Sequence, residues 1–184
     1  MSSTPQQSMV MGLNEFQAWT KTTRVYHPEI EREYLALQIA SESGEVCGAF
    51  SKMLRGDAAI NYRNVIKELG DLLWAIGLTL DMYGYDLKAV CDQAKPRVKI
   101  RTQKSAEMAS LDLNERCAKL GTNVYYDGLN SANIKAFSGV IEIMKKLADF
   151  LGTTLEGIAW ANWDKLTDRQ NREVIHDNGL GDNR

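Results

Sequence analysis

Apolar residues recur three or four positions apart along two long stretches of the chain, with polar residues between them. This spacing gathers them on one helix face, so we expect long α-helices over about 29–54 and 61–83. The stripe of the first stretch is Leu35, Ile39, Val46, Ala49 and Met53, and that of the second is Val65, Leu69, Leu72, Ile76, Thr79 and Tyr83. Only three prolines occur in 184 residues, which also favours helices.

Shorter helices are expected elsewhere in the chain. They cover about 14–23, 104–120 and the region around 165–169, and another runs from 86 towards Pro96. Residues 121–133 are expected to be the least regular part of the chain. Gly84 follows the helix over 61–83, where a left-handed cap is common. We therefore predict one all-α domain over 1–184, arranged as an antiparallel helical bundle.

Part of the first half recurs 68 residues later. Residues 66–67, 81–84 and 87–90 align with 134–135, 149–152 and 155–158, and each copy reads helix, glycine, helix. Two amphipathic units joined by glycine resemble each other in any case. The pattern therefore leaves open both an internal duplication and a chance likeness.

Composition excludes several classes of protein. The chain of 20.6 kDa is 44% hydrophobic and 25% charged, which is typical of a folded globular protein. Its net charge of −2 lacks the basic excess expected of a nucleic-acid-binding protein. No apolar run is long enough to cross a membrane, and the first ten residues do not have the pattern of a signal peptide. Three widely spaced cysteines favour reduced thiols and a cytoplasmic location: Cys47, Cys91 and Cys117.

Three pairs of acidic residues lie three positions apart, which puts both members on one helix face. The pairs are Glu42 with Glu45, Glu68 with Asp71, and Asp112 with Glu115. About three such pairs are expected by chance at this composition, so the spacing alone is weak. The first two pairs differ from the third in where they lie on their helices. Glu42 interrupts an apolar stripe, and Glu68 and Asp71 flank the apolar residue Leu69.

A carboxylate that faces a protein core is unfavourable unless it is paired or binds a cation. Antiparallel helices would bring the first two pairs together, and their charges would repel one another without a metal ion. Carboxylate oxygens suit Mg²⁺, with Mn²⁺ as an alternative. Gly44 and Gly70 lie beside these acids and would let a ligand or helix approach closely.

Residues 13–91 resemble the MazG-like, all-α nucleoside triphosphate pyrophosphohydrolases. The resemblance rests on Leu35-Ala36-Leu37 before Glu42-x-x-Glu45, and on the segment 67–74 that contains Glu68-x-x-Asp71, 22 residues beyond Glu45. Residues 14–17 are similar to that family's first helix. The tail is similar to compact bacterial and phage members in 162–166, 169–172 and 181–184. These segments cover a little over half of the chain.

The resemblance implies cleavage of an NTP or dNTP between its α- and β-phosphates, giving the monophosphate and pyrophosphate. Glu42, Glu45, Glu68 and Asp71 would hold Mg²⁺, and Glu42 or Glu45 would also orient the attacking water as a general base. Substrate contacts would come from Gln17 or Trp19 at the base and from Asn162, Lys165 and Arg169 at the phosphates. The first half, 1–100, would then bind metal, and 101–184 would carry the substrate-binding tail. A homodimer is expected, because helical enzymes of this kind commonly complete their pocket with a second chain.

The chain departs from the family pattern in one respect. About 70 residues separate the second acidic pair from the tail, where compact members have a single further helix. If 134–158 is a second copy, Glu68 and Asp71 are replaced in it by Ala136 and Gly139, which cannot bind metal. The phosphate-binding helix could then instead be the earlier one, with Lys95, Arg97 or Arg101.

Other interpretations remain open at this point. Lys165, Arg169 and Arg172 also suit a basic helix end that complements the helix dipole, and Trp74 and Trp160 suit a core. The protein could be a non-catalytic helical interaction protein that keeps a metal-stabilised scaffold. A di-iron carboxylate protein is disfavoured because its Glu-x-x-His pattern occurs only as Glu173 and His176 in a polar tail.

Overall fold

The computed structural model describes residues 11–57 and 61–172, and this part of the chain is helical throughout, without a β-strand. The predicted all-α class is therefore confirmed. Its helices are α1 (Leu13–Thr20), α2 (Glu31–Leu54), α3 (Tyr62–Met82), α4 (Leu87–Gln93), α5 (Gln103–Asp127), α6 (Ser131–Phe150) and α7 (Leu155–Asn171), with 3₁₀ turns at Lys21–Thr23 and Pro28–Ile30. The tail segment 181–184 and the pair Glu173 and His176 lie outside the described residues.

Polar side chains fix where most of these helices begin. Each of five caps accepts a hydrogen bond from a backbone N–H of the first helical turn, which satisfies a donor that the helix itself leaves free. The caps are Asn61, Asp86, Thr102, Asn130 and Thr154. Gly84 and Gly152 follow α3 and α6 with φ angles of 74° and 73°, a region that glycine enters without strain.

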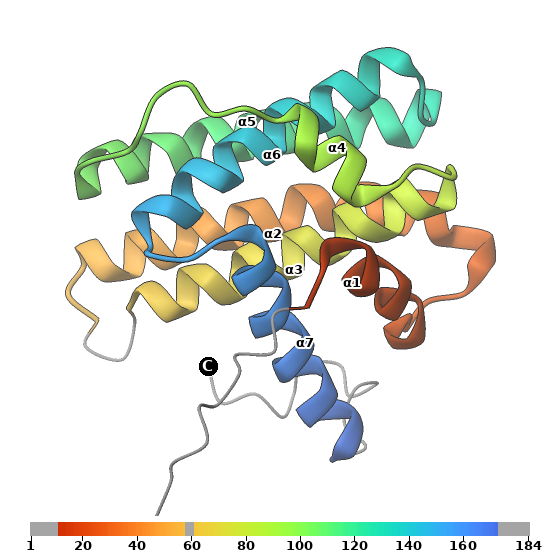
Figure 1. Ribbon diagram of the computed structural model, residues 1–184, viewed down its shortest axis with the longest axis horizontal. Coiled ribbons are helices and arrows are strands. Elements are labelled where there is room, and N and C mark those ends of the chain that lie inside the picture. The colour runs from red at the N-terminus through yellow and green to blue at the C-terminus, as the bar shows by residue number, and fades with distance from the viewer. Residues whose placement is uncertain (1–10, 58–60, 173–184) are drawn as a thin grey trace, which may run out of the picture.

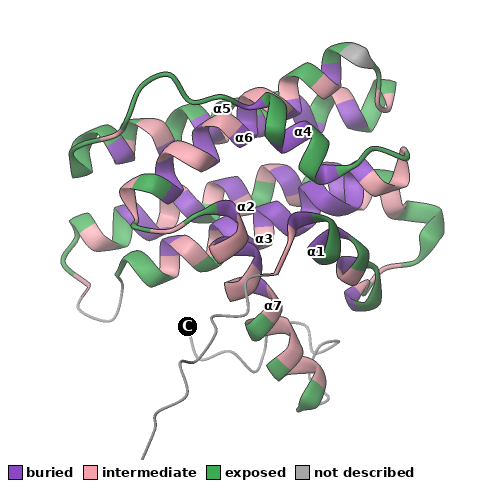
Figure 2. Cartoon of the chain, in the orientation of Figure 1, coloured by how far each residue is buried: buried purple, intermediate pink, exposed green. Residues whose placement is uncertain are grey.

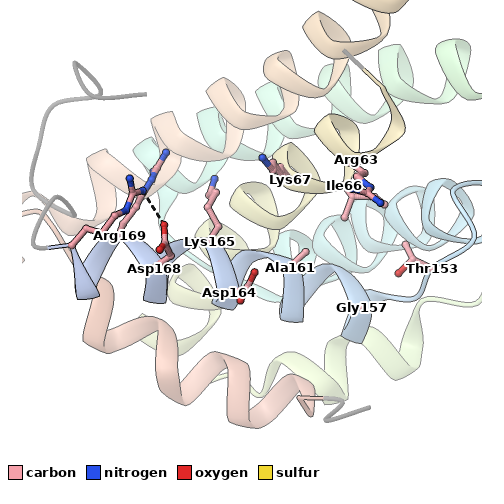
Figure 3. A pocket seen from close by; sticks show the side chains of 11 residues that line it. Arg63, Ile66, Lys67, Thr153, Gly157, Ala161, Asp164, Lys165, Asp168 and Arg169 are labelled. Atoms are coloured by element: carbon pink, nitrogen blue, oxygen red, sulfur yellow. Dashed lines mark ion pairs between the residues drawn. The ribbon is translucent and has the colours of Figure 1, made fainter. Parts of the chain in front are cut away.

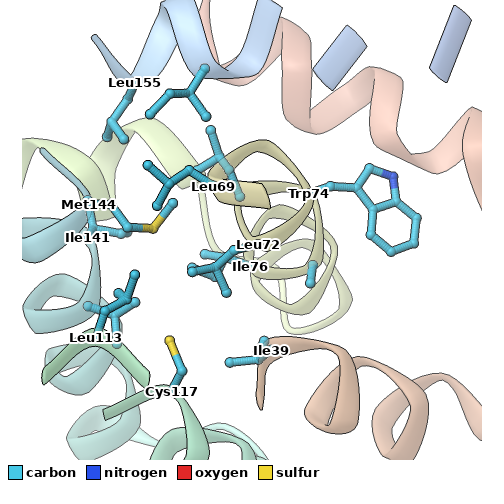
Figure 4. Close-up of a cluster of buried hydrophobic side chains, with 14 of the residues drawn as sticks. Ile39, Leu69, Leu72, Trp74, Ile76, Leu113, Cys117, Ile141, Met144 and Leu155 are labelled. Carbon is cyan, nitrogen blue, oxygen red and sulfur yellow. The ribbon is translucent and has the colours of Figure 1, made fainter. Parts of the chain in front are cut away.

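Two pairs of long helices make up most of the molecule. α2 packs against α3, α5 packs against α6, and the two pairs meet mainly through α2 and α5 (Figure 1). α7 packs against α3 and extends away from both pairs, next to α1. The buried residues gather between these two helix pairs (Figure 2). Side chains from all four long helices meet there, among them Ile39, Leu72, Ile76, Leu113, Cys117, Ile141 and Met144 (Figure 4).

The segment expected to be irregular, 121–133, is helical over most of its length. α5 continues through Gly121 to Asp127, and α6 starts after a short turn at residues 128–130. A Cβ atom at Gly121 would lie 2.5 Å from the carbonyl oxygen of Ala36. Gly121 therefore does not end the helix but allows α5 to approach the backbone of α2 closely.

The segments related by 68 positions adopt the same local structure. Leu69, Leu72, Leu73 and Ile76 of α3 are fully buried, and so are the aligned residues of α6, which are Phe137, Val140, Ile141 and Met144. Each helix ends before a left-handed glycine, and a capped helix follows at Leu87 and at Leu155. The two copies differ after that point, because α4 has 7 residues and α7 has 17.

Across 11–57 and 61–172, every helix is too short or too polar to cross a membrane.

Candidate metal centre and adjoining basic cleft

Three of the four predicted metal ligands come together where α2 packs on α3. Glu42 projects from α2, and Glu68 and Asp71 project from α3. One carboxylate oxygen from each of the three lies within 4.8 Å of the other two. All three side chains are partly buried, so the acids share a site that bulk water reaches only in part.

Glu45 is the fourth predicted ligand and lies at the edge of this cluster. Its side chain is exposed, and it is not among the three residues whose oxygens converge. Its charge is still near enough to contribute to the raised pKa of Glu42 and of Glu68. Glu45 thus faces the solvent side of the site, from which a water molecule or substrate would enter.

Burial and mutual repulsion disfavour the ionised form of the cluster. Desolvation, followed by repulsion from Asp71, Glu45 and Glu68, raises the pKa of Glu42 to about 8. Burial and the charge of Asp71 also raise the pKa of Glu68. A site that holds these groups so close needs either protons or a cation, and only a cation leaves the oxygens free as ligands.

Asp71 is held from the opposite side by α7. Asn162 donates from Nδ2 to one Asp71 oxygen at 2.7 Å, and Lys165 forms an ion pair with the other oxygen. Gly70 makes this approach feasible, because a Cβ atom there would lie 2.9 Å from Cβ of Asn162. The sequence had indicated a close approach near Gly70, and the approaching element is α7.

The donor set suits a hard cation. Carboxylate oxygens converge, and the fully buried Oδ1 of Asn162 has no hydrogen-bond partner among the described residues. A buried acceptor without a partner is unfavourable and indicates a donor or cation nearby. These oxygen ligands, with no histidine or cysteine in the group of three, fit Mg²⁺ or Mn²⁺.

A basic cleft of about 570 Å³ lies beside the acids, between α3 and α7. The side chains of the two helices face each other across it (Figure 3). Its cations are Arg63, Lys67, Lys165, Arg169 and Arg172, and its acids are Asp164 and Asp168. Asp168 pairs with Arg172 at 2.9 Å, and Lys165 reaches both the cleft and Asp71. Lys165 therefore connects the cleft to the acidic cluster, although the clustered acids themselves do not line the cleft.

Sequence reasoning identified Lys165 and Arg169 in this cleft and missed Arg63 and Lys67. The missed residues are four positions apart on α3, and Lys67 directly precedes Glu68. That spacing was a usable signal, because residues four apart share a helix face. Lys95, Arg97 and Arg101, the alternative phosphate ligands, lie between α4 and α5 and do not line the cleft.

Gln17, predicted to contact the base, has a structural role instead. Its side chain is 7% exposed, donates to the carbonyl oxygens of Gly77 and Tyr85, and accepts from the backbone N–H of Leu87. These bonds tie α1 to the α3–α4 turn and leave Gln17 unavailable to a ligand. That interpretation of Gln17 is corrected accordingly.

The tryptophans also lie outside the lining of the cleft. Trp19, predicted to contact the base, packs against Phe16 and Trp163 where α1 meets α7. Trp74 is a core residue, as expected, and donates to the hydroxyl of Thr23. Trp160 is only partly buried and stacks on Trp163 with ring centroids 4.7 Å apart, so its expected place in the core is corrected.

Comparisons of the chain with models of protein families, with curated proteins and with solved structures found no match.

Proposed function

We propose that the protein is a Mg²⁺-dependent hydrolase that cleaves an NTP or dNTP between its α- and β-phosphates, with Mn²⁺ as an alternative metal. The observation that carries this proposal is the shared residue Lys165, which joins a cluster of metal-binding acids to a cleft lined with cations. Phosphoryl-type transfer needs these two features side by side, because the metal and the cations must act on one polyphosphate. The choice of the α–β bond rests on the resemblance to the MazG-like family alone.

Glu42, Glu68 and Asp71 would hold Mg²⁺, with Glu45 at the open edge of the cluster. Mg²⁺ would supply neutralisation of phosphate charge and activation of the attacking water. Lys67, Lys165 and Arg169 hold the β- and γ-phosphates in the cleft. Asn162 keeps Asp71 oriented and keeps its own Oδ1 available to the site.

The attacking water loses its proton to Glu42 or Glu45. Water oxygen forms a bond to the α-phosphorus, the bond from that phosphorus to the bridging oxygen breaks, and pyrophosphate leaves with the electron pair. Glu45 suits the proton acceptor's position because it is exposed at the mouth of the cluster. Glu42, whose carboxylate lies inside the cluster, is the second candidate that the resemblance implies.

We also propose the arrangement that the resemblance implies for the whole chain. It is an antiparallel bundle of the MazG-like type, formed by one domain in which α5 and α6 are a diverged copy of α2 and α3. The protein acts in the cytoplasm on a free nucleotide, without nucleic acid or membrane as partner. The equal burial of aligned residues in α3 and α6 supports the duplication.

A homodimer is part of this proposal. Large apolar side chains stay exposed along α2 and α5, namely Leu37, Met108, Leu111 and Tyr126. Leu37 and Tyr126 line one hollow between α2 and α5, and exposed apolar side chains that lie together are common at interfaces between chains. Light scattering coupled to size-exclusion chromatography is expected to give a mass near 41 kDa, about twice the 20.6 kDa of one chain. A mass near that of one chain would contradict the dimer and leave the hydrolase proposal intact.

Two other functions fit less well. A non-catalytic interaction protein has no need for a cleft of five cations linked through Lys165 to three converging acids. A di-iron protein of the expected type uses histidine, and the converging group consists of carboxylates.

Product analysis tests the proposed reaction. The purified chain is incubated with each of the eight common NTPs and dNTPs and Mg²⁺, and the products are separated by ion-exchange chromatography. We expect monophosphate and pyrophosphate, lost in Glu68→Gln and kept in Glu107→Gln, whose side chain lies on α5 outside the cluster. Diphosphate and orthophosphate would refute the assigned bond. No turnover of any nucleotide, with Mg²⁺ bound, would favour the non-catalytic interpretation.

A further inference from the structure

A second cavity occupies the place on α5 and α6 that corresponds to the acidic cluster on α2 and α3. The shift of 68 positions aligns Glu68 and Asp71 with Ala136 and Gly139, and both of these line the cavity. The third acidic pair of the sequence, Asp112 and Glu115, lines it from α5. The third acidic pair therefore lies at a cavity, which the sequence alone did not indicate.

Cations outnumber acids in this second cavity. Arg116 and Lys119 line it from α5 and Lys135 lines it from α6, together with Asp112 and Glu115. At the first site, Asp71 pairs with Lys165, and the carboxylates of Glu42, Glu68 and Asp71 converge. The aligned positions of α6 carry small neutral residues instead, and three cations and two acids line the cavity there.

The side chain of Arg116 extends from α5 towards Gly139 of α6. Its Nε donates to Asp112 at 2.8 Å, and its Nη1 lies 3.5 Å from the position that a Cβ atom at Gly139 would take. The guanidinium group therefore lies close to the position aligned with Asp71. The bond to Asp112 uses one of its five N–H donors, so others remain to bind a ligand.

Lys119 and Lys135 complete the set of cations. Both side chains are exposed, and neither has an ion-pair partner within 11–57 and 61–172. Three cations from two helices thus converge on one hollow while only Arg116 is neutralised by a neighbour. Such an arrangement favours an anion with several charged oxygens over a single carboxylate.

We propose that the cavity between α5 and α6 is a second, metal-independent binding site for a small phosphate-bearing anion of the size of pyrophosphate. Its volume of about 360 Å³ is large enough for such an anion. The site binds without Mg²⁺, because Ala136 and Gly139 provide no side-chain ligand for a metal. The proposal concerns binding alone and does not depend on the hydrolysis proposed above.

Calorimetric titration of the full chain with inorganic pyrophosphate, in EDTA and at low salt, tests this site. We expect two binding events in the unmodified protein, one in the basic cleft and one in the cavity. Lys119→Gln combined with Lys135→Gln is expected to weaken one event by about tenfold or more, because it removes two of the three cations that line the cavity. Lys104→Gln, an exposed lysine of α5 outside the cavity, is the matched control and should keep both events.

A second variant pair separates the two sites. Arg63→Gln with Lys67→Gln should weaken the cleft event and leave the cavity event in place. Ala136→Glu with Gly139→Asp should remove the cavity event, because these acids restore the charge of the first site. Circular dichroism confirms that each variant is folded. The proposal is overturned if the Lys119 and Lys135 double variant titrates like the unmodified protein, or if all binding is lost with Arg63 and Lys67.

Discussion

Two helix pairs in this molecule share a packing scheme and differ in what they offer to an ion. On α3, Glu68 and Asp71 meet Glu42 of α2, whereas the aligned positions of α6 carry Ala136 and Gly139. The apolar residues between these positions are buried in both helices. The two helices thus keep the same buried face, and two positions beside that face decide whether carboxylates converge there.

The acidic cluster of α2 and α3 places like charges close together, which is electrostatically unfavourable. The acidic site brings like charges together, so that burial and repulsion raise the pKa of Glu42 to about 8. The α5–α6 cavity mixes charges, and Arg116 there is already paired with Asp112. An unfavourable arrangement of acids is often associated with function, and binding of a cation, as proposed above, would offset the repulsion.

The largest expected effect comes from removing one acid of the cluster. Glu68→Gln keeps the shape of the side chain and removes a charged ligand, so we expect turnover of the best NTP or dNTP to fall by more than about 100-fold. Isothermal titration with Mg²⁺ should show weaker binding in the same variant. Unchanged turnover in Glu68→Gln would contradict the assignment of Glu68 as a ligand, and Glu107→Gln serves as the control.

A smaller effect is expected from Lys165, which connects the two parts of the site. Lys165→Met removes a charged contact to phosphate, so KM should rise by about tenfold or more. Mg²⁺ affinity should stay the same or increase, because Asp71 loses a competing partner. Steady-state kinetics and Mg²⁺ titration measure the two quantities. A fall in Mg²⁺ affinity with KM unchanged would show that Lys165 supports the metal site only, and Lys104→Gln is the control.

Two glycines provide a matched test of packing. Gly70→Ala places a Cβ atom 2.9 Å from Cβ of Asn162 and 3.4 Å from the backbone oxygen of Ile158, so α7 must shift. We expect a loss of about 1–3 kcal/mol, seen as a Tm lower by several degrees. Gly139→Ala meets only the flexible end of Arg116, at 3.5 Å, and should gain up to about 1 kcal/mol from better helix propensity. Equal Tm changes in both variants would contradict the proposed role of Gly70.

The last expected effect is a dependence of stability on pH without metal. Glu42 has a pKa of about 8 in the folded chain and an ordinary value near 4.5 when unfolded. The folded chain therefore holds a proton that the unfolded chain releases, and this stabilisation is lost as pH rises through about 8. In EDTA, Tm should fall between pH 5 and pH 9, by about 2–4 °C for each kcal/mol lost.

Glu42→Gln provides the matching measurement. It removes the titrating group, so Tm in EDTA should depend less on pH and should exceed that of the unmodified chain at pH 8.5. Mg²⁺ should raise Tm of the unmodified chain at that pH and have little effect on the variant. Identical pH profiles for the two proteins would contradict the account of the acidic cluster.

Much of the fold was predictable from residue spacing. Helical stripes identified α2 and α3, and Gly84 marked the end of α3. The continuation of α5 through Gly121 was not predictable, because a glycine that permits close packing and a glycine that ends a helix look alike in a sequence. Only the position of Ala36 in space distinguishes them.

The candidate site was predictable to a similar extent. The acids were identified because a charged residue on an apolar stripe is unusual, and Glu42 and Glu68 do converge. The buried hydrogen bonds of Gln17 could not be predicted, because its three partners lie 60 to 70 residues away in the sequence. Arg63 and Lys67 were missed because basic residues on a helix are common, and only the packing of α7 on α3 turns them into a cleft.

Hydrolysis in ¹⁸O-labelled water with Mg²⁺ tests the central claim most directly, that the acids of α2 and α3 and the cations of the cleft act together on one polyphosphate. The preferred NTP or dNTP is turned over once and the products are examined by mass spectrometry. The account predicts monophosphate that carries the label, and unlabelled pyrophosphate, because water attacks the α-phosphorus. Label in pyrophosphate or orthophosphate, or the same turnover in Glu68→Gln, would contradict it.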